Sequence, residues 1–361
     1  MAEEQIFLTQ YSHGAGCGCK IAPSVLEQIL QTTTATSSFP NLVVGNSSKD
    51  DAAVYDLQKG SLLISTTDFF TPIVDDAFDF GRVAAANAIS DVYAMGGNPL
   101  LAIAILGWPV DKLPASLAQQ VLEGARSVCE EANIPLAGGH SIDSPEPIFG
   151  LSVNGLVEKS CLKKNNTAKE GDVLLLTKPI GVGILSTAQK RKVLNAEHEG
   201  LAIKFMSKLN SIGKELGKIS GVNAMTDVTG FGLLGHLIEM AEGSGLSAEL
   251  YYSKIPVIEA AKVYLAQRIV PDATYRNWNS YSSKVAFETA RPDDPVGRGV
   301  NVMEAFNLLP DPQTNGGLLI AVNPNSLNDV VDLFKEHDLT DYIEAIGTFI
   351  KMGEKTIRVL P

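Results

Sequence analysis

"NAISDVYAMGG" (residues 87–97) ends a predicted helix in the first half of the chain. The helical pattern starts at about Asp79, a good N-cap residue, and runs to Met95, where two glycines favour termination. Asn87 and Asp91 are four residues apart, so both project from one face of this helix. That face is otherwise small and apolar, and an unpaired buried charge is costly. We therefore expect both side chains to have polar partners.

Strand-like runs flank this helix on both sides. "SLLISTTDFF" (61–70) precedes it, and "LLAIAILGW" (100–108) follows it as a buried-strand candidate. A second helix is predicted over 115–132, and another strand over "PIFGLSVNGLVE" (147–158). Because strands and helices alternate throughout, the fold class is α/β or α+β, with the order of the strands undetermined.

The length of the chain indicates more than one domain. Its 361 residues exceed the usual single-domain size of roughly 100–200 residues. The polar run "EKSCLKKNNTAKEGD" (158–172) is the predicted boundary. We expect a flexible glycine-rich flap at 1–20, between an N-terminal strand candidate and a short helix, then domains at 21–157 and 158–361.

Charge and hydropathy exclude several classes of protein. The net charge of −12 argues against nucleic acid as the main partner, because a polyanion needs a basic face. A small anion such as a nucleotide is still allowed if divalent metals bridge carboxylates to phosphates. The longest apolar run, "PLLAIAILGWPV" (99–110), is too short to span a membrane. The acidic N-terminus lacks the features of a secretory signal, so we expect a soluble cytoplasmic protein.

Four aspartates stand out by their context. Asp51, Asp68, Asp91 and Asp227 lie at the ends of separate predicted elements or within them. Hard oxygen ligands of this kind suit Mg²⁺, which takes one or two carboxylates together with waters and substrate phosphates. The simpler alternative is that each aspartate is a cap or a turn former. Spacing in the sequence does not decide between these interpretations.

Glycine motifs give a weaker signal. "GFGLLG" (230–235) matches the dinucleotide-binding pattern G-x-G-x-x-G, but the preceding "NAMTDVT" is polar rather than a buried parallel strand. We favour a glycine-rich turn that opens a helix. The chain has no P-loop motif. Each of "LAGGHS" (136–141) and "DPQTNGGLL" (311–319) is consistent with a plain turn, and together they suggest close approaches of the backbone to a ligand.

"YSHGAGCGCK" (residues 11–20) allows several roles for Cys17. A zinc site needs about four ligands, and His13, Cys17 and Cys19 supply at most three. A disulfide between Cys17 and Cys19 would be strained and disfavoured in a reducing cell. A reactive thiolate fits better, because Lys20 lies nearby and a neighbouring cation lowers the pKa of a thiol. An unreactive thiol is the remaining alternative.

Several motifs together resemble one enzyme family, selenophosphate synthetase (selenide, water dikinase) of the bacterial type. They occur in order from about residue 8 to 320: "HGAGCGCK", "DDAAVYDL", "STTDFF", "NAISDVYAMGG", "LAGGHSID", "LTKPIG", "MTDVTGFGLLGH" and "DPQTNGGLL". The glycine–cysteine–lysine loop is the most specific, whereas related ATP-using enzymes share the aspartate motifs. The chain departs from the family at Asn315, where serine is usual. We expect this difference to alter a turn and leave the chemistry intact.

The resemblance implies a two-domain α+β fold of the aminoimidazole-ribonucleotide-synthetase type, with ATP, Mg²⁺ and dimerisation assigned to the N-terminal domain. It also implies a homodimer and the reaction ATP + selenide + water → selenophosphate + AMP + phosphate, which provides selenium for selenocysteine and selenouridine. The sequence leaves open whether free selenide or a selenium-delivery protein is the donor.

The resemblance also implies roles for individual residues. Cys17 and Lys20 match catalytic positions. Asp51, Asp91 and Asp227 match Mg²⁺ ligands. The positions that match ATP contacts are Lys20, Ser48, Lys49, Asp50, Asp68, Asp91, Gly139, His140 and Ser141.

Two rivals remain at this stage. One is a related ATP-dependent enzyme of the same fold, such as a formylglycinamidine cyclase, a thiamine-monophosphate kinase or a hydrogenase-maturation dehydratase. The other is a thiol-based metal or redox module, which would contain zinc and would not turn over ATP. The second rival leaves the distributed aspartates unexplained.

Overall fold

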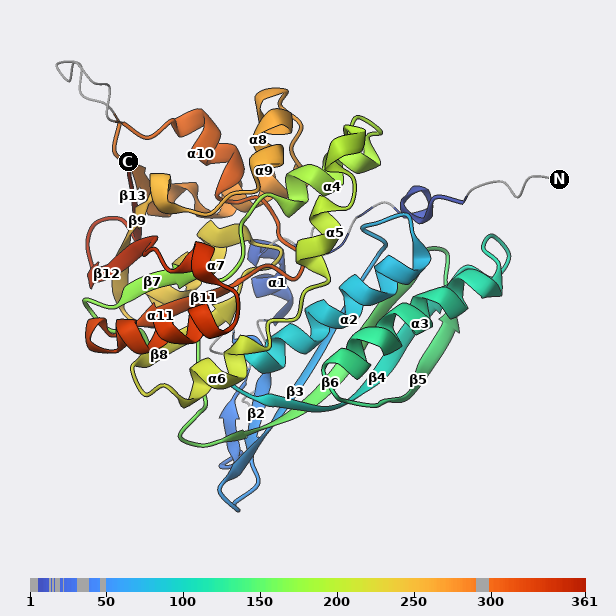
Figure 1. Cartoon of the computed structure of the whole chain (residues 1–361), viewed down its shortest axis with the longest axis horizontal. Helices are drawn as coiled ribbons and strands as arrows, with labels where there is room; N and C mark the ends of the chain where they lie inside the picture. The colour runs from blue at the N-terminus through green and yellow to red at the C-terminus, as the bar shows by residue number, and fades with distance from the viewer. Residues whose placement is uncertain are drawn as a thin grey trace.

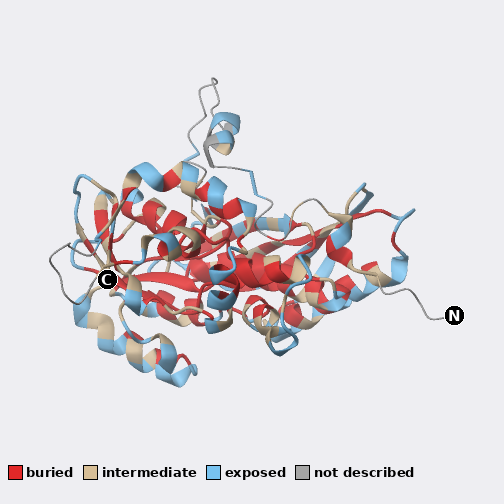
Figure 2. Cartoon of the chain, turned by 90° about the horizontal axis from the view of Figure 1, so that it is seen from above, coloured by how far each residue is buried: buried red, intermediate tan, exposed pale blue. Residues whose placement is uncertain are grey.

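The structure, a computed structural model, describes residues 6–12, 14, 16, 20, 21, 23–30, 39–45, 50–289 and 299–361. Its core consists of two mixed β-sheets, each with helices packed against it (Figure 1). Buried residues run as a continuous band through the middle of the molecule (Figure 2). The mixed α and β class predicted from the alternating elements is therefore confirmed.

The N-terminal sheet has six strands. In order across the sheet they are β1 (Leu42–Val44), β2 (Ala53–Asp56), β3 (Ser61–Phe70), β6 (Ile148–Glu158), β4 (Asn98–Trp108) and β5 (Leu136–Asp143). Among the described strand pairs of this N-terminal sheet, only β4–β5 is parallel. The predicted strands at 61–70 and 147–158 are confirmed to within one residue.

Two helices, α2 (Ala77–Ala94) and α3 (Ala115–Glu131), cover one face of this sheet. They cross closely because each helix has a glycine at the contact. A Cβ on Gly124 would lie 1.9 Å from the carbonyl oxygen of Phe78. The predicted start of α2 at Asp79 was wrong. Asp76 is the N-cap, because its side chain accepts a hydrogen bond from the backbone N–H of Asp79, the third residue of the helix.

In the described part of the chain, no helix covers the opposite face of the N-terminal sheet (Figure 1). The prediction of a fully buried strand over 100–108 was consequently only half right. Leu100 and Ile103 are 47% and 41% exposed, whereas Ala102 and Ala104 face α2 and α3 and are buried. The alternation is that of a strand with one covered face. The edge strand β5 is exposed along nearly its whole length.

The C-terminal sheet has seven strands. In order they are β10 (Val285–Phe287), β13 (Ile357–Leu360), β9 (Leu246–Tyr251), β12 (Gly347–Lys351), β7 (Val173–Leu176), β11 (Leu318–Val322) and β8 (Val222–Asp227). The helices of this half are α4 (Val182–Lys190), α5 (Leu201–Met206), α6 (Ile212–Lys218), α7 (Gly232–Gly243), α8 (Glu259–Ala266), α9 (Asp272–Tyr281), α10 (Val302–Leu308) and α11 (Leu327–Glu336). The sequence boundary between residues 157 and 158 falls at the end of β6, and we retain it as a proposal.

The two halves meet along α2, which is buried on nearly every side. Its small residues let α5 and α6 approach from the C-terminal half. At its end, Gly96 has a φ of 74°, and a Cβ there would lie 2.4 Å from the carbonyl oxygen of Cys161. The "GG" that ends the helix therefore also permits close contact with the segment that leads into the second half.

Three local predictions needed correction. The N-terminal strand candidate is a short 3₁₀ helix, Leu8–Tyr11. The segment before "GFGLLG" is the buried strand β8, although it pairs only antiparallel with β11 among the described strands, so the dinucleotide fold is absent there. The glycine pair of "LAGGHS" lies inside β5 and is not a turn. No helix in the described part of the chain is long and apolar enough to span a membrane.

Candidate active site

Three of the predicted aspartates meet where the two halves join. Asp51 precedes β2, Asp91 lies in α2 and Asp227 ends β8. Asp91 and Asp227 are 9% and 2% exposed, and Asp51 buries its Oδ2. The packing of α2 against β3 and β8 thus gathers carboxylates that lie far apart in the sequence.

Each carboxylate has one hydroxyl donor. Thr226 Oγ1 donates to Asp51 Oδ1 at 2.7 Å. Thr66 Oγ1 donates to Asp91 Oδ2 at 2.5 Å. A hydrogen bond from Ser90 lowers the pKa of Asp227. These hydroxyls orient the carboxylates without neutralising them.

The electrostatics of the cluster favour a cation. Burial raises the pKa of Asp51 well above its usual value, and the negative charges of Asp227, Asp91 and Asp50 raise it further. Burial likewise raises the pKa of Asp91, followed by repulsion from Asp227 and Asp68. Burial is also the main cause that raises the pKa of Asp227. Like charges in a dry site resist ionisation unless a positive group joins them.

Two oxygens in this cluster are candidates for coordinating such a cation. Asp51 Oδ2 and Asp227 Oδ2 are buried, and no hydrogen-bond donor reaches either of them from the described residues. Buried carboxylate oxygens normally have a partner, and hard oxygens of this type suit Mg²⁺. Within the described ranges, however, no three Asp, Glu, His or Cys side chains are already arranged to hold a metal ion. The chemistry of these carboxylate oxygens nevertheless fits Mg²⁺.

Lys20 is the cation that approaches the aspartates. Its Nζ lies 3.7 Å from Asp68 Oδ2. Asn87 Nδ2 donates to the same Asp68 oxygen at 2.6 Å, and Asn315 N donates to Asn87 Oδ1 at 2.7 Å. The prediction that the side chains at 87 and 91 have polar partners is therefore confirmed. The network joins the N-terminal segment, the first sheet and the "DPQTNGG" loop.

Asn315 occupies a turn that suits asparagine. Its φ is 49°, in the left-handed region that asparagine adopts more readily than serine. Its Nδ2 donates to the carbonyl oxygens of Met206 and Lys208 at 2.6 and 2.9 Å. The departure from the family pattern therefore adds side-chain hydrogen bonds to the turn, and the backbone N–H that reaches Asn87 does not depend on the side chain.

Other predicted ATP contacts are placed differently. Asp50 accepts a hydrogen bond from the backbone N–H of Asn165 at 2.9 Å. Ser48 and Lys49 lie outside the described residues. Gly139, His140 and Ser141 are exposed on β5.

The β5 residues do not converge with Asp68 within one chain. The register pairs Asp68 with Leu151, Leu151 with Ala104, and Ala104 with Gly139. Three strand spacings of roughly 4.8 Å each place Gly139 about 14 Å from Asp68. Only glycine fits at 139, because a Cβ would lie 2.2 Å from the carbonyl oxygen of Ala104.

Comparison with known proteins identifies the family. The family "AIR synthase related protein" matches with its N-terminal domain at residues 49–157 and its C-terminal domain at 169–360. A protein of Photobacterium profundum named "Selenide, water dikinase" is 54% identical over 356 residues, which is 98% of this chain and 99% of that protein. A protein of the same name from Yersinia pseudotuberculosis is 56% identical over 94% of each chain. This chain belongs to the selenide, water dikinase family.

Solved structures confirm the two-domain fold that this family was expected to have. Thiamine-monophosphate kinase from Stenotrophomonas maltophilia has a TM-score of 0.63 at 19% identity, covering 89% of this chain and 91% of that one. Hydrogenase maturation protein HypE in complex with ATP has a TM-score of 0.60 at 18% identity, covering 88% and 83%. At such identities the likeness concerns the fold alone.

For a selenide, water dikinase, the most specific motif is the loop that carries Cys17. Cys17, His13 and Cys19 lie outside the described residues. The segment on its N-terminal side is anchored to both halves. Gly16 N donates to the carbonyl oxygen of Thr71 at 3.1 Å, and Lys190 Nζ donates to that of Gly14 at 3.0 Å.

Sequence reasoning missed several residues of this dikinase site. The hydroxyl donors Thr66, Ser90 and Thr226 adjoin the motif aspartates, and the period-two alternation of β3 already placed Thr66 on the face of Asp68. Lys178 was also missed. It is buried, donates to the carbonyl oxygens of Lys208 and Asn315, and burial lowers its pKa to about 7.

Proposed function

We propose that this protein converts ATP, selenide and water into selenophosphate, AMP and phosphate, and so supplies activated selenium for selenocysteine and selenouridine. The observation that carries the proposal is the identity of more than half of all positions with dikinases along nearly the whole chain. The buried carboxylate cluster beside Lys20 supports it, because phosphoryl transfer depends on positioning and charge stabilisation.

Mg²⁺ is proposed as the cation that Asp51, Asp91 and Asp227 hold. The support is the raised pKa of each carboxyl group and the two buried oxygens without a donor. When bound, Mg²⁺ would offset the charge of the polyphosphate and polarise its oxygens. The hydroxyls of Thr66 and Thr226 orient Asp91 and Asp51 and leave the remaining carboxylate oxygens for coordination.

Lys20 is proposed to stabilise negative charge that develops on the transferred phosphoryl group. Its side chain is 37% exposed, and its ion pair with Asp68 is long, so a phosphate oxygen can replace that carboxylate as its partner. Asn87 holds the Asp68 carboxylate in place when Lys20 turns to the substrate. Ser48, Lys49 and Asp50 are proposed to contact ATP beside them.

Cys17 is proposed to receive or guide selenium next to Lys20. The proposal rests on the glycine-rich loop and on the cation three residues away, which favours a thiolate. Full selenide-dependent turnover by a Cys17→Ala variant would show that this role is wrong. Free selenide is the proposed substrate, and delivery by a selenium-carrying protein is the alternative donor. Reactive thiols persist in a reducing compartment, which favours the cytoplasm.

A homodimer is proposed to form through the uncovered face of the N-terminal sheet. Tyr55, Phe69, Leu100 and Ile103 are each more than 40% exposed on strands of that sheet. Contiguous apolar surface of this kind marks an interaction site. Since one chain separates Gly139–Ser141 from Asp68 by about 14 Å, we propose that ATP bound between two protomers meets both groups.

The products of the nucleotide test the proposal. Anaerobic incubation with ATP, Mg²⁺ and selenide, followed by chromatography of nucleotides, should give AMP and phosphate only when selenide is present. Formation of ADP, or turnover that needs a different small substrate, would instead favour a sister kinase of the same fold.

A further inference from the structure

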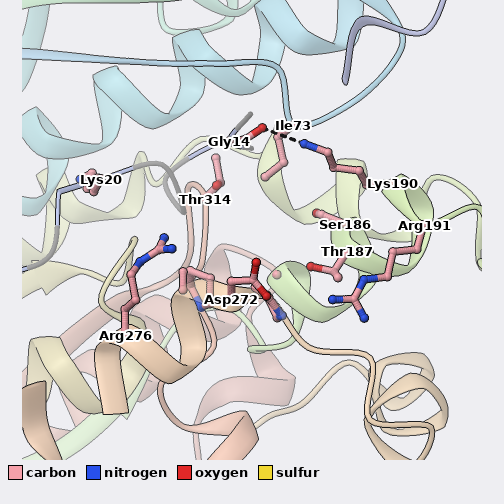
Figure 3. A pocket seen from close by; sticks show the side chains of 14 residues that line it. Gly14, Lys20, Ile73, Ser186, Thr187, Lys190, Arg191, Asp272, Arg276 and Thr314 are labelled. Carbon is pink, nitrogen blue, oxygen red and sulfur yellow. Dashed lines mark hydrogen bonds between the residues drawn. The ribbon is translucent and has the colours of Figure 1, made fainter. Parts of the chain in front are cut away.

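A second site, this one basic, lies near the carboxylate cluster. It is a cavity of about 550 Å³ between α4 and α9 (Figure 3). Gly14 and Lys20 of the N-terminal segment border it, and Thr314 of the "DPQTNGG" loop lines it as well. Because Lys20 also pairs with Asp68, one side chain lies between the carboxylate cluster and this cavity.

The cavity carries positive charge in an acidic protein. Lys20, Lys190, Arg191 and Arg276 line it, and Asp272 is the one carboxylate among its described lining residues. This local excess of three positive charges contrasts with a net charge of −12 for the chain. A concave surface lined by one sign of charge concentrates ligands of the opposite sign.

One face of α4 supplies most of the polar lining. Gly183, Ser186, Thr187, Lys190 and Arg191 follow the spacing i, i+3, i+4, i+7 and i+8, which places them on a single stripe. On a helix packed against a domain such a stripe is usually apolar. Here it presents Thr187, Lys190 and Arg191 to the cavity instead, whereas the hydroxyl of Ser186 donates to the carbonyl oxygen of Val182 at 2.7 Å.

The N-terminal amides of α4 are not available to a ligand. Gly181 N and Val182 N donate to Gln313 Oε1, and Gly183 N donates to Asp311 Oδ2. These three amides therefore do not hold an anion in the cavity, and α4 contributes to it through side chains.

The lining also limits the kind of anion. None of the described residues that line the cavity is aromatic, so a nucleotide base has no ring on which to stack. Guanidinium groups match the oxygens of phosphate in a fork geometry, and lysine and hydroxyl groups complete such a site. A small tetrahedral oxyanion fits these donors better than ATP does.

Lys190 connects the cavity to the N-terminal segment. Its Nζ donates to the carbonyl oxygens of Ser12 and Gly14 at 3.3 and 3.0 Å, as Figure 3 shows for Gly14. Lys190 thereby joins the cavity to the described residues Ser12 and Gly14 of the N-terminal segment.

We infer that this cavity binds a phosphate-class oxyanion, namely the orthophosphate released from ATP, separately from the site at the aspartates. The choice of orthophosphate rests on the proposed function, whereas the anion site itself rests on the cavity, its cations and its hydroxyls. Lys20 lines the cavity and also pairs with Asp68, so the two sites share one cation.

The test is a titration of the full-length protein with inorganic phosphate, without ATP, selenide or Mg²⁺, followed by isothermal calorimetry and ³¹P line width. Saturable binding that weakens with added KCl is expected, because the arginines at the rim are exposed. Arg191→Gln and Arg276→Gln should each raise the dissociation constant for phosphate about fivefold to tenfold. Arg191→Lys and Arg276→Lys should bind phosphate more tightly than the glutamine variants do.

Arg126→Gln is the matched control, because Arg126 is exposed on α3 and does not line the cavity. Equal weakening by this control, or no saturable binding to the unchanged chain, would overturn the inference. The same variants should also relieve inhibition of turnover by added phosphate. Phosphate binding without dikinase turnover would reject the proposed function and keep the anion site. Turnover without phosphate binding would reject the anion site and keep the proposed function.

Discussion

At the scale of single residues, the oxygen environment of Asp227 is the feature that most strongly implies a bound cation. Its Oδ2 is buried without a donor in the described part of the chain, and burial raises the pKa of the carboxyl group. A ligand that binds only the folded state stabilises it in proportion to its occupancy.

We therefore expect Mg²⁺ to raise the melting temperature of the unchanged protein and to leave that of Asp227→Asn almost unchanged. When the Mg²⁺ concentration is a hundredfold above the dissociation constant, the stabilisation that Asp227→Asn loses should be about 2–3 kcal/mol. Differential scanning calorimetry with and without Mg²⁺ measures it. Asp172→Asn is a control at another buried aspartate, and an Mg²⁺ response retained by Asp227→Asn would contradict the assignment.

Asp311 gives the chain a pH-dependent stability of its own. It is fully buried, and burial raises the pKa of its carboxyl group to about 8. Because the folded-state pKa lies above the usual 3.8, the folded chain holds the proton more tightly than the unfolded chain does. Stability from this group is therefore complete below about pH 4 and decreases as pH rises toward about 8.

Between pH 5 and 9 the melting temperature should accordingly fall more in the unchanged protein than in Asp311→Asn, in thermal unfolding followed by circular dichroism. The asparagine keeps an oxygen for Gly183 N and does not ionise. Parallel pH profiles for the two proteins would show that Asp311 does not titrate in this range.

The sequence predicted the aspartates better than their surroundings. Asp51, Asp91 and Asp227 were selected from motifs, and their role as Mg²⁺ ligands remains a prediction. Their hydroxyl donors arise where β3, α2 and β8 meet, which is a tertiary contact that no local pattern encodes. The left-handed turn at Asn315 was likewise invisible in composition, although asparagine is favoured in such a turn.

At the scale of elements, the crossing of α2 and α3 holds the first half together. Alanine normally stabilises a helix by about 1 kcal/mol relative to glycine. At Gly124, however, a Cβ would lie 1.9 Å from the carbonyl oxygen of Phe78, and the facing Gly81 has the same relation to Val121.

We expect Gly124→Ala to lower the free energy of unfolding by about 1–3 kcal/mol, because the helices must separate. Chemical denaturation measures the change. Gln120→Ala on the exposed side of α3 should leave stability nearly unchanged. A gain in stability from Gly124→Ala would mean that the crossing is looser than described.

The elements that sequence reasoning placed well are those with strong local signals. The strand at 61–70 and the helix at 115–132 have clear periodicity and clear ends. The strand over 100–108 was called buried because its residues are apolar, yet Leu100 and Ile103 face outward. Periodicity does not distinguish a strand buried on both faces from one whose apolar outer face is exposed in the single chain.

At the scale of the whole molecule, that uncovered sheet face predicts the oligomeric state. Ile103 is at the middle of β4, and Tyr55 on β2 and Phe69 on β3 are further exposed apolar residues of the same sheet, on the other side of β6. A charge buried there without a partner would oppose association.

Ile103→Asp should therefore convert a dimer into a monomer in light scattering coupled to size-exclusion chromatography, and should weaken ATP binding if the nucleotide lies between protomers. Val110→Asp, a substitution at an apolar residue that is 62% exposed beyond the end of β4, is the control. A dimer that persists in Ile103→Asp would place the interface elsewhere.

The fold and family followed from the sequence because several motifs appear in a fixed order over most of the chain, and the relatives confirm both. The meeting of the two halves along α2 did not follow from it. That contact depends on small residues in α2 and on glycines at its end, and it is what places Asp91 beside Asp227.

The most direct test of the central claim is ³¹P NMR of the purified protein incubated anaerobically with ATP, Mg²⁺ and selenide. We predict a new phosphorus signal with coupling to selenium, together with AMP and phosphate in equal amounts, and loss of that signal in Lys20→Ala. Conversion of ATP to ADP alone, with no selenium-coupled signal, would contradict the assignment of this chain as a selenide, water dikinase.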